Sequence, residues 1–227
     1  MISWLDSERS LAWALQFWPA MVFSVTTSLC ATVLCRRLAV HWGIVDRPDD
    51  LVKTHKEPVA YLGGIGILCG ILGGVLAGSL YATDRLTPLD IRWLIMIAGG
   101  ALTACTVGVV DDILDLAPRQ KLVGQILAAT FLILAGIQPH IQWFGQFGPK
   151  GVQDVLNMAM VYVLVVGATN SLNLLDGLDG LCAGVTGIMA TGMLLLSLCM
   201  LTLGVHAAGD PVRLILCLAL VGGVLGF

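Results

Sequence analysis

Long apolar segments alternate with short polar loops along most of the chain. Seven such segments lie at residues 18–35, 62–82, 92–110, 122–137, 154–170, 181–204 and 212–227. A segment of about 20 apolar residues is long enough to cross a bilayer as a helix. Backbone polar groups in lipid must be hydrogen-bonded within the segment, so these runs predict helices. The pattern predicts an all-α, polytopic integral membrane helix bundle with about seven transmembrane helices.

The composition agrees with a membrane protein. Hydrophobic residues make up 57% and charged residues 12% of the 227 residues, and the charged fraction is about half that of an average soluble domain. The formal net charge of −3 argues against nucleic acid as a partner. The seven cysteines are scattered without a C-x-x-C pair, which argues against a zinc or redox site. We expect one transmembrane domain over residues 1–227.

The distribution of basic residues predicts which loops face the cytoplasm. Seven spans place the loops 36–61, 111–121 and 171–180 on one side of the membrane and the N-terminus on the other. The first of these loops contains Arg36, Arg37, Arg47, Lys53 and Lys56. Positively charged loops stay in the cytoplasm, so we expect this side to be cytoplasmic and the N-terminus to be outside. The polar clusters described next all fall on this side, which predicts one site built from three loops.

Three aspartates follow the third apolar segment. Asp111 and Asp112 are adjacent, and Asp115 follows one helical turn later. On a helix Asp115 shares a face with each of the other two, and close carboxylates repel one another unless protons or a cation intervene. Oxygen-rich surroundings suit a hard cation, Mg²⁺ in particular. Lys121, a few residues on, could meet a phosphate. The alternative interpretation of the cluster is a charged helix end.

Four polar residues repeat every three positions after the fifth segment: Asn170, Asn173, Asp176 and Asp179. Each step of three falls about 60° short of a full helical turn, so all four cannot lie on one stripe of a continuous helix. Both aspartates precede a glycine, which favours a helix break that lets the side chains converge. Asparagine amides supply hydrogen bonds, and aspartates supply charge for a metal or for proton transfer. The alternative is a plain turn between two spans.

The basic loop carries further candidate ligands. Lys53 and His55 lie between Pro48 and Pro58, and the two prolines disfavour a continuous helix there. The lysine and histidine side chains suit phosphate groups or anionic lipid. A loop that only fixes the topology would carry the same charge, so this alternative stays open.

Glycines recur at every fourth position of the next apolar segment. They are Gly66, Gly70, Gly74 and Gly78. This spacing predicts a small-residue face on which another helix packs closely. The partner helix can come from the same chain or from a second copy, so a homodimer is one arrangement that the face permits.

In this order and spacing, the three polar clusters resemble the polyprenyl-phosphate N-acetylhexosamine-1-phosphate transferases, which are glycosyltransferases of family 4. The matching patterns are D-R-P-x-x-x-x-K-T-H-K-x-P-x-x-x-L-G-G at 46–64, G-x-x-D-D-x-x-D-L-x-x-x-x-K-L-x-x-Q at 108–125 and N-x-x-N-x-x-D-G-x-D-G-L-x-x-G at 170–184. The first pattern is more similar to the branch that uses UDP-N-acetylglucosamine. The phospho-N-acetylmuramoyl-pentapeptide transferases of peptidoglycan synthesis remain an alternative.

The resemblance implies a reaction. A membrane polyprenyl phosphate, such as undecaprenyl phosphate, attacks the β-phosphate of a UDP-N-acetyl-amino sugar. UMP leaves, and a polyprenyl-diphosphate-linked sugar remains in the lipid bilayer as the start of a cell-envelope polysaccharide. The family implies Mg²⁺ as the cofactor, with Mn²⁺ as a possible substitute. It also implies a multi-pass protein of the bacterial plasma (inner) membrane with a cytoplasmic active site.

The resemblance also implies roles for individual residues. The catalytic residues are Asp111, Asp112, Asp176 and Asp179. The metal ligands are Asp112, Asp115, Asp176 and Asp179. The substrate-binding residues are Lys53, His55, Lys121, Asn170 and Asn173.

The sequence departs from the family pattern in two places. Val52 stands where the family often has a basic residue. Two further cytoplasmic elements of the family, one with a metal-binding aspartate and one rich in histidine and arginine, do not occur before residue 227. We therefore expect this chain to be the N-terminal two-thirds of the enzyme and inactive by itself. A non-catalytic short relative and a transporter or channel are the alternatives; transport does not require the asparagine and aspartate array.

Overall fold

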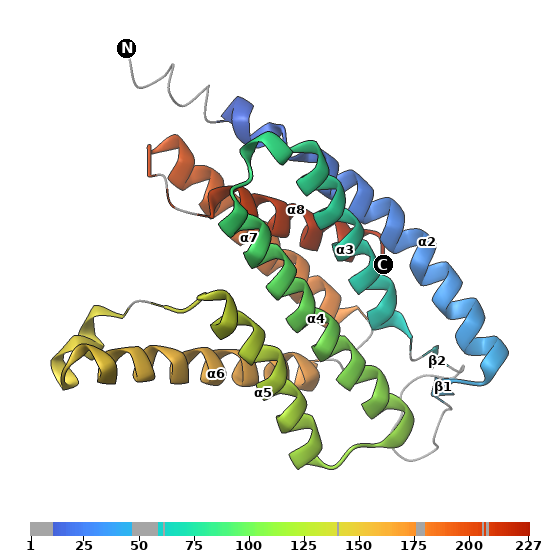
Figure 1. Ribbon diagram of the computed structural model, residues 1–227. Helices are drawn as coiled ribbons and strands as arrows, with labels where there is room; N and C mark the ends of the chain where they lie inside the picture. Colours follow the sequence, from blue (N-terminus) through green and yellow to red (C-terminus); the bar gives the residue numbers. More distant parts are fainter. Residues whose placement is uncertain are drawn as a thin grey trace. The chain divides into compact units, whose positions relative to one another are not determined.

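The computed structural model describes residues 11–46, 59–60, 62–139, 141–175, 180–205, 207 and 209–227. Within these ranges the long helices are α2 (Trp18–Trp42), α3 (Gly63–Tyr81), α4 (Pro88–Leu114), α5 (Pro118–Ala135), α6 (Lys150–Leu175), α7 (Leu181–Thr202) and α8 (Asp210–Leu225). Two short 3₁₀ helices are η1 (Thr83–Arg85) and η2 (Gln142–Phe147) (Figure 1). Each predicted apolar segment corresponds to one long helix, and the all-α fold is confirmed.

Five of the described helices are long and apolar enough to cross a membrane, by length and composition. They are Leu11–Trp42, Gly63–Tyr81, Pro88–Leu114, Lys150–Leu175 and Leu181–Thr202. The first turn of α5 is polar, with Arg119, Gln120 and Lys121 after Pro118, and α8 has only 16 residues. These two helices are not among the five. In α4 and in α6 alike, only 11% of the apolar 18-residue stretch is buried inside the protein. Outward-facing apolar side chains are typical of a multi-pass membrane protein whose solvent is lipid.

The first long helix extends beyond its predicted end. The apolar segment ends at residue 35, but α2 continues through Arg36 and Arg37 to Trp42. Gly43 ends the helix with a φ of 70°, and the N–H of Ile44 donates to the carbonyl of Ala39 at 2.9 Å. A glycine in the left-handed region is a common helix stop. The expected end was wrong because basic residues mark a membrane boundary and do not interrupt a helix.

A small β-ladder closes the loop that follows α2. Strand β1 (Val45–Asp46) pairs antiparallel with β2 (Val59–Ala60), with Val45 opposite Ala60 and Asp46 opposite Val59. The periodicity of the sequence did not predict this pair, because two residues are too few to show alternation. The ladder brings the two ends of the basic loop together.

The described chain divides into two compact units, residues 1–90 with 183–227, and residues 91–182. In the first unit α2, α3 and α8 lie side by side (Figure 1). The four glycines predicted to form a packing face on α3 do so. A Cβ atom on Gly70 would lie 2.5 Å from the Cβ of Ser28, and one on Gly66 would lie 2.5 Å from the Oγ1 of Thr32. The face therefore packs within the chain, on α2.

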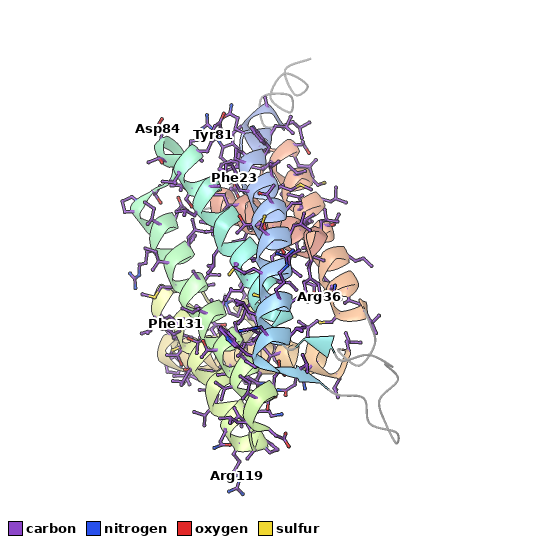
Figure 2. The ribbon with its side chains drawn as sticks, turned by 90° about the vertical axis from the view of Figure 1, so that its right-hand side faces the viewer. Phe23, Arg36, Tyr81, Asp84, Arg119 and Phe131 are labelled. Atoms are coloured by element: carbon purple, nitrogen blue, oxygen red, sulfur yellow. The ribbon has the colours of Figure 1, made fainter. Side chains whose placement is uncertain are left out.

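Helix α8 completes this packing through serine hydroxyls. Ser24 and Ser28 of α2 are fully buried and donate to the carbonyl oxygens of Ala219 and Gly223 at 2.6 and 2.7 Å. A hydroxyl that bonds a neighbouring backbone carbonyl satisfies its own polar group where water is absent. At the C-terminal end of α3, the ring of Tyr81, which Figure 2 labels, lies with its centroid 6.3 Å from that of Trp18.

The second unit begins with the antiparallel pair α4 and α5. A Cβ on Gly99 would lie 2.8 Å from the ring of Phe131, which Figure 2 labels, and one on Gly100 would lie 3.0 Å from the carbonyl of Ala128. Near the start of α4, Arg92 and Trp93 donate to the carbonyls of Leu134 and Ala135 at 2.6 and 3.1 Å. These two bonds satisfy carbonyls at the C-terminus of α5 that have no partner inside the helix.

Candidate active site

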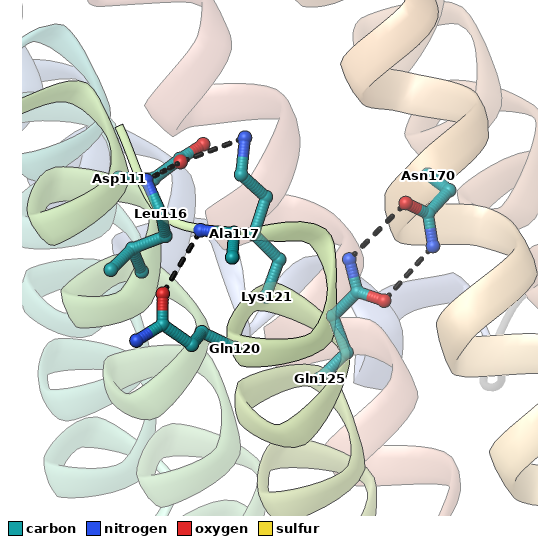
Figure 3. A network of polar contacts seen from close by, with 7 residues as sticks. All are labelled: Asp111, Leu116, Ala117, Gln120, Lys121, Gln125 and Asn170. Atoms are coloured by element: carbon teal, nitrogen blue, oxygen red, sulfur yellow. Dashed lines mark hydrogen bonds and ion pairs between the residues drawn. The ribbon is translucent and has the colours of Figure 1, made fainter. Parts of the chain in front are cut away.

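The carboxylate of Asp111 closes the turn between α4 and α5. Helix α4 ends at Leu114, and Asp115 adopts a left-handed conformation with a φ of 50°. The backbone N–H of Asp115 donates to the carbonyl of Asp111 at 2.8 Å, and that of Leu116 donates to Oδ1 of Asp111 at 3.1 Å (Figure 3). Aspartate is one of the few residues that tolerate this backbone region. The turn therefore fixes the Asp111 carboxylate in the last turn of α4.

Lys121 of α5 reaches back to the same carboxylate oxygen. Its Nζ lies 2.8 Å from Oδ1 of Asp111 (Figure 3). The hydrogen bond to Asp111 raises the pKa of Lys121 above its ordinary value, and the charges of Asp111, Asp115 and Asp112 add to this effect. The ammonium group is therefore fully charged at neutral pH. The Oδ2 atom of Asp111 accepts no hydrogen bond from the described residues, so it can meet a ligand.

The first turn of α5 is held by its own sequence. Pro118 begins the helix, and the side chain of Gln120 accepts a hydrogen bond from the backbone N–H of Ala117 at 2.9 Å. Proline suits the first helical position, and a glutamine at this point satisfies a donor that has no partner inside the helix. These two features fix the start of the helix that carries Lys121.

Gln125 and Asn170 join α5 to α6 through two hydrogen bonds. Nδ2 of Asn170 donates to Oε1 of Gln125 at 2.9 Å, and Nε2 of Gln125 donates to Oδ1 of Asn170 at 3.4 Å (Figure 3). Nδ2 of Asn170 also donates to the backbone carbonyl of Val166 at 2.8 Å. Both N–H groups of this amide are thus used. Asn173, one turn later, is exposed, and its side chain has no hydrogen bond to another described residue.

The remaining predicted residues fall into two groups. Asp112 and Asp115 are exposed beside Asp111 at the end of α4. Lys53, His55, Asp176 and Asp179 lie outside the described residues, so their expected places are not tested. Helix α6 ends at Leu175 and α7 begins at Leu181. The expected helix break at the Asp-Gly steps falls on residues 176–179, outside the described residues.

The aspartates fit a hard cation by their chemistry. Asp111 and Asp112 lie in the last turn of α4, which contains no basic residue. Carboxylates at the negative end of a helix dipole raise the local negative charge, and this attracts a cation. Among the described side chains, however, no group of three His, Cys, Asp or Glu residues converges closely enough to hold a metal ion. Two of the four expected metal ligands, Asp176 and Asp179, lie outside the described residues.

The contact between Gln125 and Asn170 was not predicted from the sequence. Gln125 stands at the last position of the second pattern, and Asn170 was expected to bind substrate. A signal was present, because Lys121 and Gln125 are spaced by four and therefore share a face of α5. Lys121 contacts Asp111 of α4, and Gln125 contacts Asn170 of α6. This face of α5 therefore connects the aspartates at the end of α4 with the asparagines of α6.

Comparison with known proteins gives a consistent picture. The model of glycosyl transferase family 4 matches residues 94–227. A probable undecaprenyl-phosphate N-acetylglucosaminyl 1-phosphate transferase of Bacillus subtilis is 27% identical over 92% of this chain. Decaprenyl-phosphate N-acetylglucosaminephosphotransferases of Mycolicibacterium smegmatis and Mycobacterium tuberculosis are 29% and 30% identical over 87% of it. The chain spans about half the length of these relatives, 53% of the first and 49% of the other two.

Proposed function

The chain belongs to glycosyl transferase family 4, and on this premise we propose that it transfers N-acetylglucosamine 1-phosphate from UDP-N-acetylglucosamine to a polyprenyl phosphate. The observation that carries the proposal is the Asp111–Lys121 pair at the end of a helix long enough to cross a bilayer. A site at this depth suits a reaction between a soluble nucleotide and a lipid. The relatives named for N-acetylglucosamine favour this sugar over the muramoyl-pentapeptide.

The reaction moves one phosphoryl group. An oxygen of the lipid phosphate attacks the β-phosphorus of the UDP-sugar, the bond from this phosphorus to the bridging oxygen breaks, and UMP leaves. The sugar 1-phosphate stays attached to the lipid through the new diphosphate. Positioning and charge neutralisation contribute most of the catalysis in such reactions.

The protein residues divide this work. Oδ2 of Asp111 orients the lipid phosphate or accepts its proton, and Lys121 exchanges its carboxylate partner for a phosphate oxygen. Asn173 binds the nucleotide-sugar with its whole carboxamide, and Asn170 uses the second lone pair of Oδ1. Lys53 and His55 meet the phosphates of the donor.

Asp112, Asp115, Asp176 and Asp179 would hold Mg²⁺ or Mn²⁺. A bound divalent cation supplies charge neutralisation at the diphosphate. The residues suit this role because they are all oxygen ligands, and Asp112 and Asp115 stand at the negative end of α4. We also propose that the chain forms a single transmembrane domain in the bacterial inner membrane, with its N-terminus outside and its active site in the cytoplasm. A homodimer is part of the same proposal.

A transfer assay tests the function. The intact gene product, purified in detergent, is incubated with radioactive UDP-N-acetylglucosamine, Mg²⁺ and either undecaprenyl or decaprenyl phosphate. We expect label in the lipid extract and an equal amount of UMP. Transfer from the UDP-muramoyl-pentapeptide alone would contradict the proposed sugar, and ion flux in liposomes without transfer would contradict the enzyme.

A metal-binding variant tests the cation site. Asp112→Asn should abolish transfer and weaken Mn²⁺ binding measured by EPR. Asp154→Asn is the matched control, because Asp154 is an exposed aspartate near the start of α6. Unchanged Mn²⁺ affinity in Asp112→Asn would remove this residue from the metal site.

A further inference from the structure

Two helices of the second unit, α5 and α6, are joined beside the candidate site by the side chains of Gln125 and Asn170. Helix α5 carries Lys121 toward α4 and, one turn later, Gln125 toward α6. The Gln125–Asn170 pair lies one turn before Asn173, whose amide has no hydrogen bond to another described residue. The position of Asn173 relative to the Asp111–Lys121 pair therefore depends on how α6 is held against α5.

The orientation of the Asn170 amide is fixed by its backbone contact. Because one N–H of Nδ2 donates to the carbonyl of Val166, the amide cannot turn over without losing that bond. A partner for the remaining N–H and for Oδ1 must then offer one acceptor and one donor. Among side chains in their usual ionisation states, a second carboxamide offers both in one plane, and Gln125 reaches across the helix interface to do so.

We propose that Gln125 is a positioning residue for the transfer reaction: by pairing with Asn170, it sets where the last turn of α6 and Asn173 stand relative to Asp111 and Lys121. The catalytic part of this inference rests on the proposed function. The helix contact itself does not, because it is a property of the second unit alone.

A second contact between the same helices provides a matched control. Oγ1 of Thr130 and the hydroxyl of Tyr162 are 3.2 Å apart, and they also join α5 to α6. Tyr162→Phe removes one hydrogen bond at the same interface but lies two helical turns before Asn170. A purely structural role for Gln125 predicts similar effects of Gln125→Leu and Tyr162→Phe. A positioning role predicts an effect on the site for the first variant alone.

The first measurement uses catalysis. A misplaced reacting group costs rate through lost orientation, so Gln125→Leu should lower kcat by about tenfold or more with a smaller change in the KM for the lipid acceptor. Tyr162→Phe should stay within about twofold of the wild type. The exchanged pair, Gln125→Asn with Asn170→Gln, should recover part of the lost kcat because it restores two facing amides.

The second measurement does not need activity. Spin labels at Val123 of α5 and Leu174 of α6, which are 57% and 85% exposed, report the distance distribution between the two helices on a cysteine-free background. Gln125→Leu should broaden or shift this distribution, and Tyr162→Phe should leave it close to that of the wild type.

The outcomes separate the two proposals. An unchanged distance distribution in Gln125→Leu would overturn the positioning role, and so would a changed distribution with wild-type kcat. If the wild-type protein transfers no sugar phosphate with any donor, the proposed function fails. The distance measurement then decides by itself whether Gln125 holds α6 in place.

Discussion

Among the described residues, the Asp111 carboxylate is bound through one oxygen only, and this asymmetry defines its chemistry at the residue scale. Its Oδ1 atom accepts from both Lys121 and the backbone of Leu116, while Oδ2 has no donor among the described residues. A carboxylate held in this way cannot rotate freely, so Oδ2 keeps a fixed direction. A carboxylate oxygen with a fixed direction and free lone pairs is suited to accept a proton from a phosphate hydroxyl.

The titration of Lys121 gives a prediction that needs no enzyme assay. Its pKa is raised in the folded protein by the hydrogen bond to Asp111, so the ion pair is complete below the ordinary lysine pKa and is lost only as the pH rises through the raised value. Asp111→Asn should therefore increase the rate at which Lys121 is acylated at mildly alkaline pH, as measured by mass spectrometry. Exposed Lys150 is the control, and equal rates at Lys121 in both proteins would contradict the pair.

The role of Asp111 as a base predicts a particular pH profile. A phosphate monoester has a second pKa near 6, so the lipid phosphate already lacks its proton at neutral pH. Asp111→Asn in the intact gene product should lose activity most steeply, by about 100-fold, below this pH and recover part of it in alkaline solution. If the loss is uniform at every pH, Asp111 acts in positioning or metal binding, and the base assignment must be dropped.

At the scale of elements, small residues decide which helices touch. Gly74 of α3 has no room for a side chain, because a Cβ there would meet the backbone carbonyl of Ala20 and lie 2.7 Å from the Cβ of Ser24. The hydroxyl of Ser24 donates to the backbone carbonyl of Ala219 in α8, so Ser24 contacts both α3 and α8. Helices in a membrane gain little from apolar burial against one another, so such close approach contributes much of their association.

The glycine face makes a stability prediction. Gly74→Ala should destabilise the protein by about 2 kcal/mol, because overpacking forces α2 and α3 apart. Gly64→Ala on the same helix is the control, since a Cβ at Gly64 meets nothing within 4 Å. Thermal unfolding in detergent should show a lower midpoint for the first variant and no loss for the second. Equal midpoints would mean that α2 and α3 do not pack through Gly74.

At the scale of the whole molecule, the helices present apolar side chains outward. Leu76, Ile95, Val163 and Ile188 come from four different helices and are 61–75% exposed. In water, apolar exposure on this scale would favour association. In a bilayer it is the expected outer surface, so the exposed residues and the helix lengths support the same environment.

The proposed topology can be tested by labelling. Single cysteines at Asp49 and Ala117, in a protein without its seven native cysteines, should be shielded from an impermeant thiol reagent in intact cells. A cysteine at Gln146, in η2, should react. Lysed cells provide the control that all three sites can be labelled. Reaction at residue 49 from outside would invert the topology and remove the argument for one shared cytoplasmic site.

Much of this protein could be predicted from the order of residues alone. The long apolar runs predict the long helices α2 to α8, because a helix satisfies its backbone hydrogen bonds within one segment. The glycines spaced by four on α3 predict a packing face, and the Asp-Asp, Asn-x-x-Asn and Asp-Gly patterns identify the candidate site. These features are local, so each can be recognised within one or two helical turns.

Only the tertiary structure decided which of these residues meet. The pairing of Lys121 with Asp111 depends on a left-handed Asp115 that turns the chain back, and the Gln125–Asn170 pair joins residues 45 positions apart. The end of α2 at Gly43 and the β1–β2 ladder likewise depend on backbone conformations that apolar periodicity does not encode. The sequence by itself determined the helices and the chemistry they carry, because both follow from local composition. The tertiary structure decided which polar groups are already bound and which remain available, because that depends on contacts between distant segments.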